Sequence, residues 1–144
     1  MSPLPTDEQP PQYDERLNQA YGAAEYVFHG FVLKVGHPHP EFDAWLTEQG
    51  YKNYAFLTAF NPRSRELSAA ANLHRLARLH ELLRGHRLPF APAEAVDPAG
   101  CWIAEKGVFL FDVSPGRVHE LARAFGQNAV VEGKVGGVAL LVWV

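Results

Sequence analysis

Glycine and proline cut this sequence into short segments, and the spacing of hydrophobic residues changes from one segment to the next. Apolar residues three and four positions apart predict helices, whereas short runs of β-branched and aromatic residues predict strands. We expect helices at 14–24, 41–49, 69–84 and 115–125. We expect strands at 26–35, 53–60, 102–105, 108–113, 129–132 and 138–144, and either a short strand or an irregular segment at 90–96. This irregular order predicts the α+β class: a mixed β-sheet with flanking helices and C-terminal β-hairpins.

Turn and capping residues define several of the predicted boundaries. Pro40 begins one helix and Gly50 follows its end, while Ser68 is the expected N-cap of the longest helix. Lys106 and Gly107 form the two-residue connection expected between the strands of a hairpin. The longest helix should contact the core through one stripe of residues: Leu73, Leu76, Ala77, His80 and Leu83.

The length of 144 residues fits one domain. We expect residues 13–144 to form a single globular domain, and the proline-rich residues 1–12 to form a disordered or extended arm. Cys101 is the only cysteine, which excludes an internal disulfide, and the sequence has neither a signal-peptide pattern nor an apolar run long enough for a membrane span. A cytoplasmic location without membrane association is therefore expected, and the oligomeric state stays open.

The charge is unevenly distributed along the chain. The formal net charge is −3, which does not favour a dedicated nucleic-acid-binding protein. Residues 61–90, however, contain six arginines and two glutamates. This basic segment is either a solvated helix face or a site for a phosphate, a nucleotide or an RNA backbone. In the second case the binding residues would be Arg75, Arg78, Arg84 and Arg87.

The junction that follows the strand at 53–60 is the most informative segment for function. A buried strand ends there, and a turn leads to a helix N-terminus, which is where α/β architectures place ligand sites. Short polar side chains can orient a ligand by hydrogen bonds, while the helix start and Arg63 favour an anion. The alternative is that these side chains only cap the turn. The candidate ligand-binding residues are Thr58, Asn61, Arg63, Ser64, Asn72, Glu105 and Gln127.

Other segments resemble functional motifs only superficially. His37 and His39 flank a proline, but a metal site needs further ligands, so no metal or other cofactor is predicted. The glycines at 133–137 lack the helix that follows a phosphate-binding loop. Cys101 and Glu105 have no catalytic partner that the sequence identifies. These observations favour a protein that is not an enzyme.

Four segments together resemble a family of bacterial proteins known as domain of unknown function 3293. They are the stretch from Ala55 to Pro62, the helix that carries Asn72, the pair Trp102 and Glu105, and the stretch from Phe125 to Ala129. The resemblance extends over about 21–144 and departs from the family pattern after Glu105, where this chain has Lys106 and Gly107. It implies a relationship and no particular activity.

The sequence thus supports three functional hypotheses. The first is a ligand-binding or regulatory domain with a polar pocket for a small anionic ligand around Asn61. The second is association with RNA or the ribosome through the arginine-rich helix at 69–84. The third is a hydrolase or transferase that acts on a phosphorylated small molecule, with Glu105 or a histidine as base.

Overall fold

A computed structural model describes residues 13–144 of the chain. Its α-helices are α1 (Glu15–Ala23), α2 (Pro40–Gln49), α3 (Ala69–Gly85) and α4 (Pro115–Ala124), and a short 3₁₀ turn, η1, spans Pro62–Ser64. The strands are β1 (Glu25–Phe28), β2 (Phe31–Lys34), β3 (Asn53–Thr58), β4 (Phe90–Val96), β5 (Glu105–Phe111), β6 (Ala129–Lys134) and β7 (Leu140–Trp143). The predicted N-terminal arm, 1–12, lies outside the described residues.

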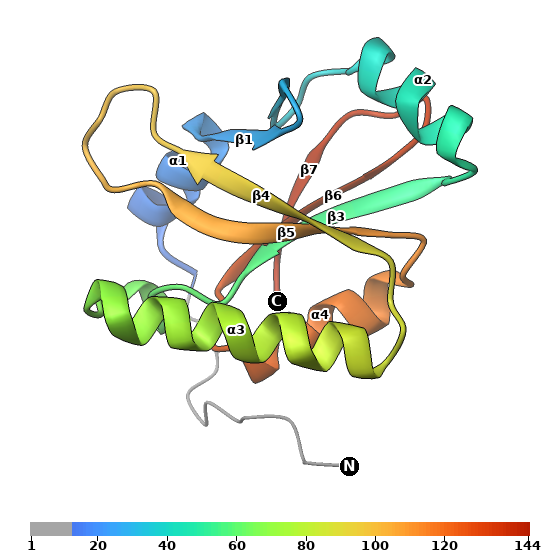
Figure 1. Cartoon of the computed structure of the whole chain (residues 1–144). Coiled ribbons are helices and arrows are strands. Elements are labelled where there is room, and N and C mark those ends of the chain that lie inside the picture. Colours follow the sequence, from blue (N-terminus) through green and yellow to red (C-terminus); the bar gives the residue numbers. More distant parts are fainter. Residues whose placement is uncertain (1–12) are drawn as a thin grey trace.

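The seven strands of the described residues belong to one sheet with the order β2-β1-β4-β5-β3-β6-β7. The predicted α+β class is confirmed, although every ladder is antiparallel rather than mixed. The segment after β2 approaches the segment before β7 through two isolated bridges, Val35 with Ala139 and Pro38 with Val138. The sheet therefore curls, and its two edges meet at one end. Figure 1 shows α3 and α4 below the sheet, α2 above it and α1 beside β1.

Several predicted boundaries are confirmed. Ser68 caps α3 by accepting a hydrogen bond from the Ala71 amide, and Ser114 caps α4 in the same way. Gly50 ends α2 in the left-handed conformation that favours glycine. The segment at 90–96 is a full strand, which pairs with β1 and β5.

The prediction of one strand at 26–35 is wrong. The segment forms two strands, β1 and β2, that pair with each other as a hairpin. The turn consists of His29 at φ 46° and Gly30 at φ 80°. Aromatic and β-branched residues on both sides of the turn give it the composition of a continuous strand, so the composition alone concealed it.

The predicted hairpin at 102–113 is also wrong. Glu105, Lys106 and Gly107 belong to one continuous strand, β5, where Gly107 lies opposite Thr58 of β3 and Ala93 of β4. A Cβ atom at Gly107 would lie 2.5 Å from the Leu57 carbonyl oxygen. The glycine is thus needed for close approach of two strands rather than for a turn.

The predicted core stripe of α3 is confirmed at Leu83, which is fully buried, but is otherwise displaced around the helix. The buried residues are Asn72, Leu79 and Leu83, whereas Leu73 is 49% exposed and Ala77 is exposed. The leucines of α3 cover a broad arc of the helix, so their spacing is compatible with more than one orientation.

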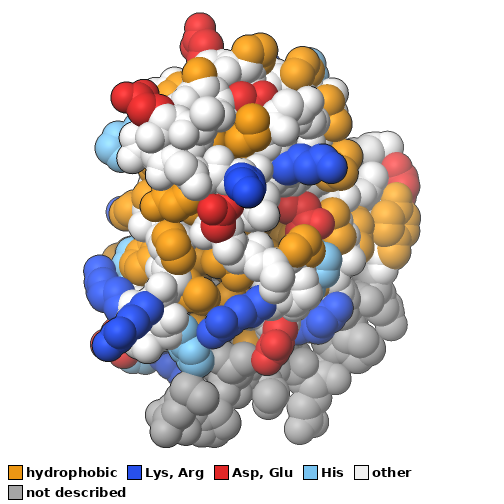
Figure 2. Space-filling view, turned by 90° about the vertical axis from the view of Figure 1, so that its right-hand side faces the viewer, with side chains coloured by type: hydrophobic (Ala, Val, Ile, Leu, Met, Phe, Trp, Pro, Cys, Tyr) orange, Lys and Arg blue, Asp and Glu red, His pale blue; other side chains and the backbone are white. Residues whose placement is uncertain are grey.

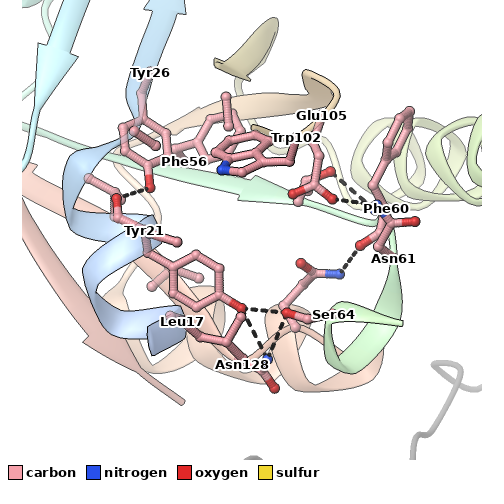
Figure 3. Close-up of a pocket in the computed structure, with 18 of the residues that line it drawn as sticks. Leu17, Tyr21, Tyr26, Phe56, Phe60, Asn61, Ser64, Trp102, Glu105 and Asn128 are labelled. Carbon is pink, nitrogen blue, oxygen red and sulfur yellow. Dashed lines mark hydrogen bonds between the residues drawn. The ribbon is translucent and has the colours of Figure 1, made fainter. Parts of the chain in front are cut away.

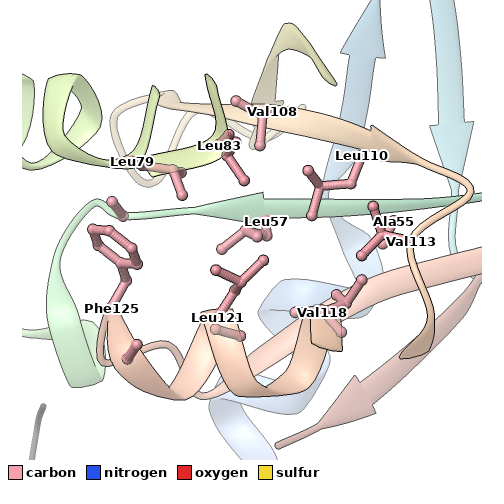
Figure 4. Packing of buried hydrophobic residues seen from close by; sticks show 14 of the residues in the cluster. Ala55, Leu57, Leu79, Leu83, Val108, Leu110, Val113, Val118, Leu121 and Phe125 are labelled. Carbon is pink, nitrogen blue, oxygen red and sulfur yellow. The ribbon is translucent and has the colours of Figure 1, made fainter. Parts of the chain in front are cut away.

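The two faces of the sheet have different cores. One face carries small and aliphatic residues, such as Leu57 and Leu110, which pack against α3 and α4 (Figure 4). The other, which we call the aromatic face, packs against α2 and includes Tyr26, Phe28, Tyr54, Phe56, Phe109 and Phe111. Because successive residues of a strand point to opposite faces, the alternation of β3 and β5 assigns Glu105 and Thr58 to the aromatic face.

Candidate functional site

A cavity of about 400 Å³ lies at the end of the aromatic face, between the sheet and α1. Ala95 is opposite both Tyr26 and Glu105 in the ladders, and its small side chain leaves space where larger residues fill the rest of this face. Ala129 of β6 lines the same space. Tyr26, Phe56 and Trp102, which we call the aromatic wall, lie together along one side (Figure 3). The cavity therefore has an apolar wall on one side and polar residues, such as Thr58 of β3 and Glu105 of β5, at the ends of the two strands.

The turn after β3 has an unusual backbone. Asn61, Arg63 and Ser64 have φ values of 46°, 53° and 58°, in the left-handed region. Such non-glycine residues are strained by about 1–3 kcal/mol each and cluster at functional sites. Two of the three, Asn61 and Ser64, line the cavity.

Hydrogen bonds hold this turn in its strained conformation. The Asn61 Oδ1 atom accepts from the Asn72 Nδ2 atom at 2.8 Å and from the Leu67 amide at 2.9 Å. The backbone N–H of Asn61 donates to Asn72 Oδ1 at 2.9 Å, so two hydrogen bonds join the two asparagines. The Arg63 amide donates to the Gly126 carbonyl at 2.7 Å. These hydrogen bonds fix the position of the Asn61 side chain.

The side-chain amide of Asn61 lies against the Glu105 carboxylate. Asn61 Nδ2 donates to Glu105 Oε2 at 2.8 Å. Burial raises the pKa of the Glu105 carboxyl, and the hydrogen bond from Asn61 opposes this rise in part. The cavity therefore contains a half-buried carboxyl group in which the charged form is destabilised.

A second polar group lies on another side of the cavity. The hydroxyl groups of Tyr21 and Ser64 are hydrogen-bonded at 2.7 Å, and Asn128 Nδ2 donates to both, at 3.1 and 3.2 Å. The Tyr26 hydroxyl donates to the Tyr21 carbonyl at 2.8 Å, which joins β1 to α1. Figure 3 shows this group facing the cavity below the aromatic wall.

The structure brings five of the seven predicted ligand-binding residues to the cavity: Thr58, Asn61, Ser64, Glu105 and Gln127. The other two, Asn72 and Arg63, are not among the residues that line the cavity, but they contact residues that do. Asn72 holds Asn61, and the Arg63 Nη1 atom donates to the Gln127 carbonyl at 2.7 Å. Gln127 Nε2 in turn donates to the Phe60 carbonyl at 3.0 Å, and the Thr58 hydroxyl donates to the Lys106 carbonyl at 2.6 Å.

Sequence reasoning did not assign Tyr21, Tyr26, Trp102 or Asn128 to the site. Tyr26 and Trp102 are aromatic residues of a kind that usually belongs to a core, so their types carried no signal. Asn128 follows Gln127 directly, and this polar pair between a helix and a buried strand was the available clue. Tyr21 reaches Ser64 across 43 positions, which no local pattern indicates.

The arginines of the alternative nucleic-acid site have separate environments. Arg75 donates to the Ala59 carbonyl at 2.6 Å and to the Phe125 carbonyl at 2.5 Å, and thus ties α3 to two turns. Arg78, Arg84 and Arg87 are exposed, with Arg84 5.8 Å from the centre of the Phe90 ring.

Within 13–144, no three His, Cys, Asp or Glu side chains are grouped closely enough to hold a metal ion. His39 uses its Nε2 atom to accept from the Lys34 amide at 2.9 Å. Cys101 is exposed at the cavity rim. None of the helices in this part of the chain is both long and apolar enough to cross a membrane.

Comparisons with known proteins identify one family. A family model described as "Protein of unknown function (DUF3293)" matches residues 57–130. The match includes Asn61, Asn72, Glu105 and Gln127, whereas Tyr21 and Tyr26 lie before it. No curated protein and no solved structure matches the chain.

Proposed function

Because the chain belongs to the family described as protein of unknown function (DUF3293), and its matched segment carries the turn at Asn61 and the Glu105 carboxyl, we propose that the domain binds a small molecule at these residues. The ligand occupies the cavity beside α1. The domain acts as a ligand-binding or regulatory protein rather than as an enzyme. Its polar side chains bond mainly to one another and to backbone groups, an arrangement that positions a ligand.

The observation that carries this proposal is the strained turn beside the cavity. Asn61 and Ser64 retain left-handed backbones, and a network that includes Asn72 and Gly126 holds the turn. Other connections of the described chain also contain a left-handed residue other than glycine, such as Asp112 between β5 and α4, but each of them contains one, whereas this turn contains three. Binding sites retain strain of this kind because a preorganised side chain loses little entropy when the ligand binds.

The positions of the charged groups refine the expectation of an anionic ligand. Arg63 was expected to pair with the anion, but its guanidinium group bonds to the Gln127 carbonyl and lies outside the cavity lining. The polar end of the ligand is better placed at Glu105 and Asn61. Its apolar part then contacts the aromatic wall.

A thermal-shift screen tests the proposal. The purified domain is screened against nucleotides, phosphorylated metabolites, amines and short RNA, because a ligand that binds only the folded state raises the melting temperature. At a hundred times its Kd, a ligand stabilises the folded state by about 2.7 kcal/mol. We expect at least one small molecule to give a saturable shift in the wild-type domain.

Two substitutions to leucine locate the binding. Ala129→Leu fills the cavity and should abolish the shift, whereas Ala77→Leu, on the exposed side of α3, should leave it intact. Trp102→Ala removes part of the aromatic wall and should weaken binding. It serves as a second test of the cavity if Ala129→Leu does not fold. A shift that persists in both cavity variants would place the ligand elsewhere and contradict the proposal.

A second candidate function is RNA binding, which the exposed Arg78 and Arg84 of α3 and the exposed Arg87 after it support. Figure 2 shows Lys and Arg side chains along the lower part of the face that it presents, with an acidic side chain among them. RNA binding by Arg78, Arg84 and Arg87 would weaken steeply with added salt. Reversal of Arg78 and Arg84 to glutamate should then abolish RNA retention, and unchanged retention would exclude this function. Arg75 is unsuitable for the test because it ties α3 to two turns.

We also propose a cytoplasmic location for this function. The single cysteine, Cys101, is exposed and supports a reducing compartment, since such a thiol would be exposed to oxidation outside the cell.

A further inference from the structure

We propose that the ligand is an organic cation, with a protonated amine, amidinium or guanidinium group at Glu105 and an apolar body against the aromatic wall. This inference rests on the proposed function, because it names the ligand of the same cavity. It differs from the anion expected from the sequence. Three features of the cavity support it: its charge, the geometry of its carboxylate and its aromatic wall.

The charged side chains that line the cavity are acidic. Among the described residues of the lining, Glu66 and Glu105 carry charge, and no lysine or arginine is present. Lys106 follows Glu105 in the strand, but successive residues point to opposite faces, so its side chain is exposed on the other side. Among the described residues, the cavity lining therefore presents acidic side chains and no lysine or arginine to a cation.

The Glu105 carboxylate can accept a further hydrogen bond from a ligand. Its Oε2 atom accepts a hydrogen bond from Asn61 Nδ2 at 2.8 Å, which holds one side of the carboxylate. Its other oxygen, Oε1, makes no hydrogen bond to any residue within 13–144. Glu105 itself is one of the residues that line the cavity. Burial raises the pKa of the carboxyl group, and a cation bound at the free oxygen would lower it again by favouring the charged form. Cation binding and ionisation of Glu105 thus support each other.

The aromatic wall suits the same ligand. The rings of Tyr26 and Phe56 lie 5.0 Å apart at an angle of 59°, and Trp102 lies beside them in the cavity lining (Figure 3). The faces of aromatic rings attract cations and also cover apolar groups. The volume of about 400 Å³ is within the usual range for small-molecule sites, so the cation has an organic body rather than being a bare metal or ammonium ion.

Three probes with the same aromatic body and different charges test the inference. They are 2-phenylethylamine (cation), 2-phenylethanol (neutral) and phenylacetate (anion), each titrated into the full chain by calorimetry at pH 7.5. We expect the amine to bind at least tenfold more tightly than the other two. Equal or tighter binding of phenylacetate or phenylethanol, or no binding of the amine, would overturn the inference.

Two isosteric variants assign the effect to Glu105. Glu105→Gln retains an oxygen for the Asn61 amide but removes the charge, and should reduce amine affinity at least tenfold while leaving phenylethanol unchanged. Glu81→Gln, on the exposed side of α3, removes an equal charge outside the cavity lining and should change amine affinity less than twofold. Equal loss in both variants would indicate a general charge effect and contradict the assignment.

A capped arginine amide distinguishes a free metabolite from a side chain of a partner. Tighter binding of the capped arginine than of 2-phenylethylamine supports a protein-borne cation, and the reverse order supports a free amine. Both results keep the cation at Glu105. If no cation binds but another small molecule gives a shift that Ala129→Leu abolishes, the cation inference fails while the proposed function stands.

Discussion

At the scale of single residues, Glu105 connects the stability of the domain with the binding that we propose. Its carboxyl group is half-buried and accepts one hydrogen bond from Asn61, so the folded state does not fully replace the water that the charged form loses. Ionisation of such a half-buried carboxyl group lowers the free energy of unfolding. Active and binding sites often retain such groups because the ligand, rather than the empty protein, supplies the missing interaction.

The pH dependence of stability follows from this cost. The folded-state pKa of Glu105 is raised by burial, so its carboxyl contributes most to stability at acid pH, where it is protonated, and this contribution is lost as the pH rises through its folded-state pKa. Glu105→Gln should therefore be more stable than the wild type at pH 7, and the advantage should shrink toward pH 4. Urea denaturation at both values measures the difference. An advantage that does not change with pH, or that Glu81→Gln reproduces, would contradict this origin.

Gly107 provides a prediction about close packing. A Cβ atom there would lie 2.5 Å from the Leu57 carbonyl oxygen and 2.8 Å from the Phe56 ring, whereas a Cβ atom at Gly116 meets nothing within 4 Å. Gly107→Ala should force β3 and β5 apart and destabilise the domain by about 1–3 kcal/mol, as overpacking does. Gly116→Ala, in the first turn of α4, should stabilise it by about 0.4–1 kcal/mol because the unfolded chain loses freedom. Thermal unfolding of the two variants compares them, and similar melting temperatures would contradict the close approach.

Residue types at the site were more predictable than their contacts. The polar residues between a strand and a helix pointed to Asn61 and Ser64, and both line the cavity, although their predicted role in ligand binding stays a prediction. The pairing of Asn61 with Asn72 and Glu105 depends on separations of 11 and 44 positions, which local patterns do not encode. For the same reason, the sequence could not show that Arg63 points to the Gln127 carbonyl.

At the scale of elements, helix types were predictable and their orientation was not. The capping residues Ser68 and Ser114 and the stop at Gly50 fixed the ends of three helices. In α3, however, the leucines occupy a broad arc, and the inward side also accepts Asn72 and Arg75, whose polar groups cap neighbouring turns. A rule that directs polar residues outward therefore displaces the expected stripe, which correctly includes Leu83 but misses Leu79.

A pair of leucines in α3 measures this orientation. Leu79 is fully buried and Leu73 is 49% exposed. Leu79→Ala should destabilise the domain by about 2–5 kcal/mol, through lost burial and a residual cavity. Leu73→Ala removes the same atoms and should change stability by no more than about 0.5 kcal/mol, as exposed substitutions do. Denaturant unfolding of both variants tests the orientation, and a larger loss for Leu73→Ala would support the stripe expected from the sequence.

At the scale of the whole molecule, the ends of the described chain close the site. The β7 residue Trp143 donates from its Nε1 atom to Asn18 of α1 at 2.9 Å, and its ring centroid lies 5.1 Å from that of Tyr13 and 5.7 Å from that of Tyr21. Helix α1 contains no buried residue of its own. Its position over the cavity therefore depends on Trp143 and on the Tyr21 contacts, and the α+β class alone could not predict this closure.

Weak attachment of α1 predicts where the molecule opens. Elements with little buried surface unfold locally at a small cost in free energy, so the amides of α1 should exchange with solvent faster than those of the central strands β3 and β5. Hydrogen exchange followed by mass spectrometry measures this, and equal protection of α1 and β5 would contradict it. Trp143→Leu should speed exchange in α1 and leave α3 unchanged. Because Leu17, Ala20 and Tyr21 line the cavity, a ligand bound there should slow exchange of α1 selectively, which makes this helix the reporter of occupancy.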